Sequence, residues 1–133
     1  MKVTHYFVDY CIGSQGIPEM ETPGDISQSH VDGILKGLES EICSIEIDCD
    51  NFSLSVEFDK HRAAFIGWYD EFNDEFYYPD NGSGNTETVD LLVNVCPEER
   101  FMCYDMADIK AIAAYFCETG GRNPHYTWAL DEC

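Results

Sequence analysis

Apolar and polar residues alternate along several short segments of the chain, a pattern typical of strands that bury one face. The clearest alternation covers 52–58, where Phe52, Leu54, Val56 and Phe58 are separated by serine or glutamate. Other segments rich in β-branched and aromatic residues predict further strands. These are 3–8, 44–47, 63–69 with a continuation at 76–78, 89–95 ending before Pro97, 101–104 and 125–130.

Two segments place apolar residues at the spacing of one helix face. The first covers 31–42, with Asp25 or Ser27 as its expected N-cap. The second covers 109–116, where Asp105 is the expected N-cap and Gly120 the expected end. The segments 13–24 and 80–85 are rich in Gly, Pro, Asn and Ser, and are predicted to be loops.

The order of these elements is strand, helix, several strands, helix and strand. We therefore expect an α+β fold, with a mostly antiparallel sheet of about five to seven strands and two helices packed on one side. The length of 133 residues fits one domain spanning 1–133.

Charge narrows the choice of partners. The chain has 26 acidic residues against 7 Lys and Arg, a formal net charge of −19. Nucleic acids and anionic membranes bind clustered Lys and Arg, so neither is an expected partner. Physiological salt screens exposed charges over about 8 Å, so evenly spread acids would mainly provide solubility. Only a cluster of acids is expected to recognise another molecule.

Acids do cluster over 63–99, a window of 37 residues with nine acids and no Lys, Arg or His. Its first part also contains seven of the aromatic residues. The composition fits either an aromatic hairpin with a solvated acidic face or a protein-binding surface, where aromatics bury area and acids steer a basic partner. The second interpretation predicts nine contact residues, which are Trp68, Tyr69, Asp70, Glu71, Asp74, Glu75, Tyr77, Tyr78 and Asp80.

Known catalytic and metal-binding motifs are not recognisable in the sequence. The sequence contains no HExxH, CxxC, GxGxxG or Walker motif. His125 and Cys117 are near in sequence without a visible orienting group, and 48–51 resembles only half of a calcium loop. We therefore expect no catalytic residue, no metal and no cofactor, and a protein that is not an enzyme.

The seven cysteines predict the compartment. Several lie in apolar runs, which favours buried, reduced thiols and therefore a reducing cytoplasm. The N-terminus lacks the pattern of a signal peptide, and the apolar stretches are shorter than the roughly 20 residues of a membrane span.

The C-terminal third resembles a known family. The helix over 109–116 continues into Glu118-Thr119-Gly120-Gly121-Arg122-Asn123-Pro124 and then Trp128. This pattern, with the helix and alternating strand upstream, resembles the immunity-protein family numbered one of bacterial polymorphic toxin systems, over roughly residues 25 to 130. Asn123 departs from the family pattern, in which Arg and Pro are adjacent, and the gap from Pro124 to Trp128 is shorter.

The resemblance implies a small cytoplasmic protein, not an enzyme, that binds and blocks a cognate secreted toxin, often one of the deaminase fold. The charge pattern agrees, because enzymes that act on nucleic acid have basic concave active-site clefts. We therefore expect an immunity protein whose acidic, aromatic surface occludes such a cleft. The alternative is an acidic nucleic-acid mimic that inhibits a DNA- or RNA-binding protein outside a toxin–immunity pair.

Overall fold

The computed structural model describes Val3 and residues 5–10, 19–21, 28–39, 42–92 and 96–131. The strands are β1 (His5–Tyr10), β2 (Glu19–Glu21), β3 (Ile42–Cys49), β4 (Phe52–Phe58), β5 (Ala64–Asp70), β6 (Glu75–Pro79), β7 (Met102–Cys103) and β8 (Trp128–Leu130). The helices are α1 (Gln28–Gly37) and α2 (Met106–Thr119), and a 3-10 turn, η1, covers Glu99–Phe101.

The strands form one antiparallel sheet in the order β2-β1-β3-β4-β5-β6-β8. The short strand β7 also pairs with β5, at the end that β6 leaves free. This architecture confirms the predicted α+β fold with a mostly antiparallel sheet and two helices.

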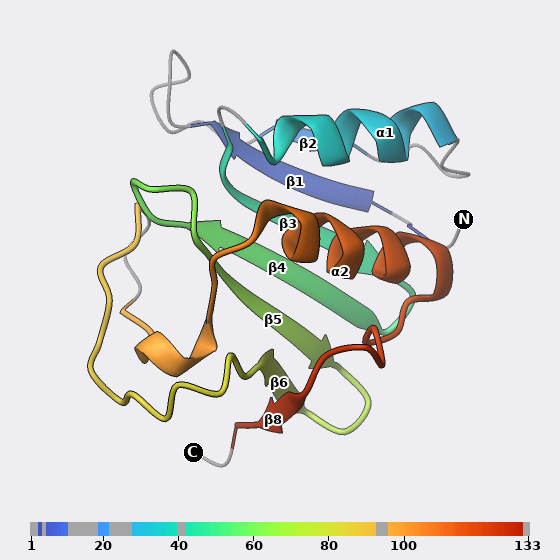
Figure 1. Ribbon diagram of the computed structural model, residues 1–133. Coiled ribbons are helices and arrows are strands. Elements are labelled where there is room, and N and C mark those ends of the chain that lie inside the picture. The colour runs from blue at the N-terminus through green and yellow to red at the C-terminus, as the bar shows by residue number, and fades with distance from the viewer. Residues whose placement is uncertain are drawn as a thin grey trace.

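Both helices cover the same face of the sheet, as Figure 1 shows, and the core lies between them and the strands. Successive side chains of a strand point to opposite faces. In β3 and β4 the apolar positions are therefore buried under the helices, whereas the serines and acids between them point away. The helices, with Leu38 directly after α1, contribute eight residues to this core, namely Val31, Ile34, Leu38, Ile109, Ile112, Ala113, Phe116 and Cys117.

The two ends of α2 form as the sequence predicts. Asp105 is the N-cap, and its side chain accepts a hydrogen bond from the Ala107 amide at 2.9 Å. Gly120 ends the helix with a φ of 74°, in the left-handed region. A Cβ at Gly120 would also lie 2.9 Å from Sγ of the buried Cys49, so both conformation and space require glycine there.

Several predicted boundaries are wrong. The helix expected over 31–42 ends at Gly37, and Ile42 instead begins β3, where it is buried in the same core as α1. Strand β2 lies inside the expected loop 13–24.

Residues 76–78 belong to a separate strand, β6, and the last strand begins at Trp128 and not at residue 125. The predicted strand over 89–95 is absent from 89–92, where the Val89 and Leu92 amides bond to Pro97 and Phe58 carbonyls outside any ladder. The remaining residues, 93–95, and the expected N-caps Asp25 and Ser27 lie outside the described residues.

Among the cysteines that the structure describes, Cys43 differs from the expectation. Cys43 is disulfide-bonded, so the prediction of reduced thiols is wrong for this residue. Four other cysteines are free, namely Cys49, Cys96, Cys103 and Cys117. Across the part of the chain that the structure describes, neither helix has the length and apolar character needed to traverse a bilayer.

Candidate protein-binding surface

The predicted contact residues lie on and around the β5–β6 hairpin. Trp68 pairs with Tyr77, Tyr69 with Phe76, and Asp70 with Glu75. Because neighbouring residues in a strand face opposite ways, this register sends the aromatic side chains to both faces of the sheet. The predicted set therefore splits into a helix-side group, a group at the tip of the hairpin and a group on the opposite face.

The helix-side group consists of Trp68 and Tyr77. Trp68 is 7% exposed, donates from Nε1 to the Gly120 carbonyl at 3.1 Å, and stacks on Phe52 at 5.1 Å between ring centroids. The guanidinium carbon of Arg122 lies 4.8 Å and 3.8 Å from the centroids of the Trp68 and Tyr77 rings. Trp68 thus joins the hairpin to the end of α2, and it offers little surface to a partner.

Asp70 is also buried, at 8% exposed, and it organises the tip of the hairpin. Its Oδ1 accepts hydrogen bonds from the amides of Phe72 at 2.9 Å and Asn73 at 3.3 Å. Its Oδ2 accepts one from the Asn73 side chain at 2.6 Å. Composition alone identified Asp70 as an acid of the cluster, whereas its hydrogen bonds give it a role in shaping the turn.

The tip of the hairpin presents the remaining acids. Glu71 and Asp74 are exposed and Glu75 is half-buried. Between them Phe72 is 82% exposed, a surface aromatic that the sequence argument did not select. Asp74 has a φ of 52° and accepts a hydrogen bond from the Tyr69 hydroxyl at 2.9 Å. That bond, which favours the protonated phenol, raises the pKa of Tyr69.

On the face opposite the helices, aromatic rings form two contacting groups. Tyr69 stacks on Phe76 with 4.4 Å between centroids. Tyr78 lies between Phe65 at 4.9 Å and Phe101 at 5.2 Å.

Two acids lie beside these rings. The Tyr78 hydroxyl donates to Asp131 at 2.9 Å, which fixes the ring against β8. Asp80 follows β6 and accepts a hydrogen bond from the Gly82 amide at 2.8 Å, so its carboxylate shapes the following turn.

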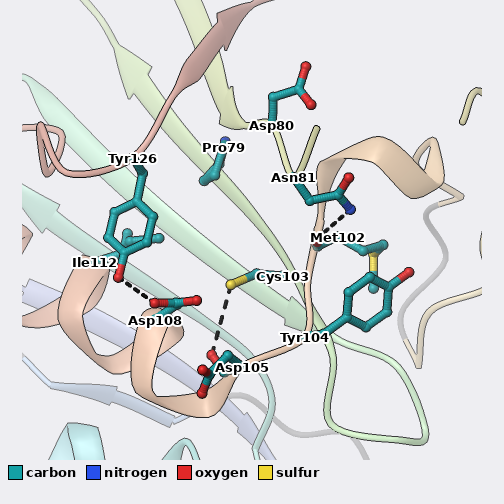
Figure 2. Close-up of a pocket in the computed structure, with 10 residues that line it drawn as sticks. All are labelled: Pro79, Asp80, Asn81, Met102, Cys103, Tyr104, Asp105, Asp108, Ile112 and Tyr126. Carbon is teal, nitrogen blue, oxygen red and sulfur yellow. Dashed lines mark hydrogen bonds between the residues drawn. The ribbon is translucent and has the colours of Figure 1, made fainter. Parts of the chain in front are cut away.

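A separate pocket of about 360 Å³ lies between α2, β7 and the segments around Asn81 and Tyr126 (Figure 2). Figure 2 shows Cys103, Asp108 and Tyr126 converging there, and the Tyr126 hydroxyl donates to Asp108 at 2.7 Å. Burial, and then the charge of Asp108, raise the pKa of the Cys103 thiol to about 11. The thiol is therefore protonated at neutral pH and is a poor nucleophile.

The second candidate thiol is equally unreactive. Cys117 is completely buried, and burial raises its pKa to about 12. The sequence neighbour His125 is exposed, and its ring packs edge-on against Tyr126 at 5.1 Å. Within the described ranges, no group of three or more His, Cys, Asp or Glu side chains is arranged to hold a metal ion.

Comparison with known proteins adds no assignment. No family model matches the chain, and no curated protein or solved structure matches it. A function for this protein therefore has to be argued from its surface and from the sequence pattern of its C-terminal third.

Proposed function

We propose that this protein is an immunity protein that binds and neutralises a cognate secreted bacterial toxin, one that acts on nucleic acid, by occluding the toxin's active site. The observation that carries the proposal is the β5–β6 hairpin. It presents exposed carboxylates and an exposed aromatic ring at its tip, inside a 37-residue window, 63–99, without Lys, Arg or His.

The chemistry of this hairpin fits a basic cleft. Carboxylates such as Glu71 and Glu75 accelerate association with a positively charged surface and disfavour acidic partners. Phe72, which is 82% exposed, supplies apolar area that remains in water until a partner covers it. Inhibition by occlusion needs no catalytic group on the inhibitor, and the toxin supplies the chemistry that is blocked.

The residues that carry the family resemblance make contacts within the fold. Gly120 caps α2, Arg122 lies over the Tyr77 ring, and Trp128 donates from Nε1 to the Asn123 carbonyl at 2.9 Å. A sequence pattern made of such residues specifies the C-terminal part of the fold. Under this proposal, surface residues determine which toxin is bound. Protection of the producing cell places the protein in the cytoplasm under this proposal.

Co-expression tests the proposal. An immunity gene lies directly downstream of its toxin gene, so the toxin domain encoded upstream is the partner to use. Wild-type protein is expected to co-purify with that domain and abolish its activity on nucleic acid. A double variant, Glu71→Lys with Glu75→Lys, is expected to slow association by on the order of tenfold at low salt.

The matched control is Asp32→Lys with Glu118→Lys, which changes the net charge equally at exposed positions on the two helices. Asp70 is left intact because its buried carboxylate holds the turn. The proposal is wrong if the wild-type protein fails to bind or inhibit the toxin domain. The hairpin assignment is wrong if both double variants bind as the wild type does.

A further inference from the structure

We infer that the pocket between α2 and β7 is a second contact site for the toxin, one that receives an arginine side chain projecting from the toxin surface. This inference rests on the proposed function and extends the contact beyond the β5–β6 hairpin. The pocket holds about 360 Å³, which lies within the size range of ligand-binding clefts. It therefore has room for one long side chain.

The walls of the pocket are mainly apolar. Pro79 at the end of β6, Met102 on β7 and Ile112 on α2 contribute carbon surface. The rings of Tyr104 and Tyr126 lie on opposite sides of the pocket, as Figure 2 shows. Apolar walls suit the aliphatic stem of an arginine, and a tyrosine ring can hold its guanidinium by a cation–π contact.

Two carboxylates at the start of α2 provide the charge. Asp108 accepts a hydrogen bond at Oδ1 from the Tyr126 hydroxyl at 2.7 Å. Asp105, the N-cap, accepts one at Oδ1 from the Ala107 amide at 2.9 Å. Both donors are uncharged, and among the described residues neither carboxylate forms an ion pair. The second oxygen of each carboxylate is available to a donor from a partner.

The fold compensates this charge only in part. The N-terminus of α2 carries about half a positive elementary charge, against the two negative charges of Asp105 and Asp108. None of the described residues that line the pocket is Lys, Arg or His. Asp80 also lines it, but its carboxylate bonds to the Gly82 amide and points away from α2 in Figure 2, so its charge lies at the rim.

Basic side chains of the described part of the chain lie around the pocket and not in it. Four are engaged with other groups, namely Arg62 with main-chain carbonyls, Arg100 with Glu98, Lys110 with Glu39 and Arg122 with Tyr77. Four others are exposed, namely Lys36 on α1, Lys60 and His61 in the β4–β5 turn, and His125 beside Tyr126. Water and salt screen exposed charges over about 8 Å, so Lys60 and His125 weaken the negative potential of the pocket without cancelling it.

The pKa values of two groups in the pocket show that negative charge prevails there. Burial, and then the charge of Asp108, raise the pKa of Cys103 to about 11. Burial, and then the hydrogen bond to Asp108, raise the pKa of Tyr126 to about 12. The charge of Asp105 adds to both shifts, and no basic side chain of the described residues lowers either pKa. A cationic side chain is therefore the complement of this pocket.

Arginine fits these acceptors better than lysine does. Asp105 and Asp108 are three positions apart along the chain, so their side chains are neighbours on the helix surface. A guanidinium carries five N–H donors in a planar fork and can donate to both carboxylates at once. An ammonium group is more strongly hydrated, and it loses more hydration on entering a pocket with apolar walls.

One partner can contact the pocket and the hairpin together. Asp108 lies in the first turn of α2, whereas the Gly120 carbonyl at the other end of the helix bonds to Trp68 of the hairpin. A helix of 14 residues is about 21 Å long. A standard interface buries about 800 Å² on each partner, which is a patch roughly 30 Å across. A single interface therefore reaches both ends of α2.

Asp108→Asn tests the contact in the complex. Asparagine keeps an oxygen for the Tyr126 hydroxyl and removes the charge, and thermal unfolding checks that the variant folds. We expect it to dissociate from the upstream-encoded toxin domain about tenfold to a hundredfold faster than the wild type, as loss of a hydrogen-bonded charge does. Asp108→Glu, which keeps the charge, should retain most of the affinity. The matched control Glu118→Gln removes one charge from the exposed other end of α2 and should bind as the wild type does.

Nuclear magnetic resonance tests the pocket in the free protein. The probe is n-propylguanidinium, which is the side chain of arginine, and n-propanesulfonate is the control with the same apolar stem and the opposite charge. We expect the cation to shift the amide signals of Cys103, Asp108 and Tyr126, with a dissociation constant on the order of 10 mM. The anion should leave these signals unchanged.

The outcomes separate this inference from the proposed function. Shifts caused by the cation alone, with faster dissociation of Asp108→Asn but not of Glu118→Gln, support the inference. Signals that ignore the cation, or respond equally to the anion, overturn it, and so does a folded Asp108→Asn variant that binds the toxin domain as the wild type does. The proposed function stands in each of these cases. A toxin domain that wild-type protein neither binds nor inhibits overturns the proposed function, and this inference with it.

Discussion

Asp70 offers the sharpest separation of scaffold from contact within the acidic hairpin. Its two carboxylate oxygens accept three hydrogen bonds from the turn, and the residue is 8% exposed. Replacing it by alanine removes all three acceptor contacts and leaves the amides of Phe72 and Asn73 without a protein partner. Both residues are exposed, so water can solvate these amides in the variant.

The expected loss follows from these bonds. A hydrogen bond to a charged group contributes about 1.5–3 kcal/mol, and one whose donor is rehydrated contributes nearer 1 kcal/mol. Three rehydrated bonds therefore predict that Asp70→Ala lowers the free energy of unfolding by about 3 kcal/mol. For a chain of this length the corresponding fall in Tm is about 10 °C.

Two variants make the comparison decisive. Asp70→Asn retains an oxygen acceptor for the two backbone amides, so we expect a loss of about 1 kcal/mol. Glu71→Ala, at the exposed neighbouring position, should change stability by less than about 0.5 kcal/mol. Urea unfolding followed by tryptophan fluorescence measures all three, since Trp68 lies in the strand that the turn follows.

The result that refutes this reasoning is equally specific. If Asp70→Ala unfolds at the wild-type urea concentration, the carboxylate does not hold the turn. If Asp70→Asn keeps its stability but no longer binds the toxin domain, the charge of Asp70 is a contact and not a scaffold. We expect Asp70→Asn to bind nearly as the wild type does.

Three further predictions concern stability, pH and thiols. Gly120→Ala should lower the free energy of unfolding by about 2–4 kcal/mol, because it places a side chain at a φ of 74° and 2.9 Å from the Cys49 sulfur. Gly33→Ala in α1, with open space around the new Cβ, should raise the free energy of unfolding by up to about 1 kcal/mol, and thermal unfolding measures both variants. Glu57→Gln should raise the Tm at pH 7, since a raised folded-state pKa penalises the ionised form. That gain should vanish as the pH falls below the ordinary value of 4.5, and a gain that persists in acid would contradict the assignment. Purified protein denatured without reductant should titrate fewer thiols than the same protein denatured after reduction, and equal numbers would contradict the Cys43 disulfide.

The elements that the sequence predicted correctly are those that depend on interactions between residues close to one another along the chain. The period-two alternation of 52–58 gave β4, and the Asp105 and Gly120 signals gave both ends of α2. Each depends only on residues within a few positions of one another. Ile42 shows the limit of this reasoning, because its apolar side chain fits the helical spacing of α1 and also the core position at the start of β3.

The candidate surface was only partly accessible from the sequence. Composition identified the acidic, aromatic window. The pairing of β5 with β6 decides that Trp68 faces the helices and that Tyr69 lies on the opposite face of the sheet. The contact of Arg122 with Tyr77 joins residues 45 positions apart, and no local pattern announces it. Alternation with the buried Ile45 and Ile47 places Glu46 on the face opposite the helices, and only the sheet order places β3 two strands from β5.

Titration of the upstream-encoded toxin domain with the purified protein tests the central claim most directly, with the toxin's activity on nucleic acid as the readout at low and high salt. The account predicts complete loss of activity at one protein per toxin, with association that slows as salt rises, because acids on the inhibitor steer a basic cleft. Toxin activity that remains unchanged at a large excess of this protein would contradict it.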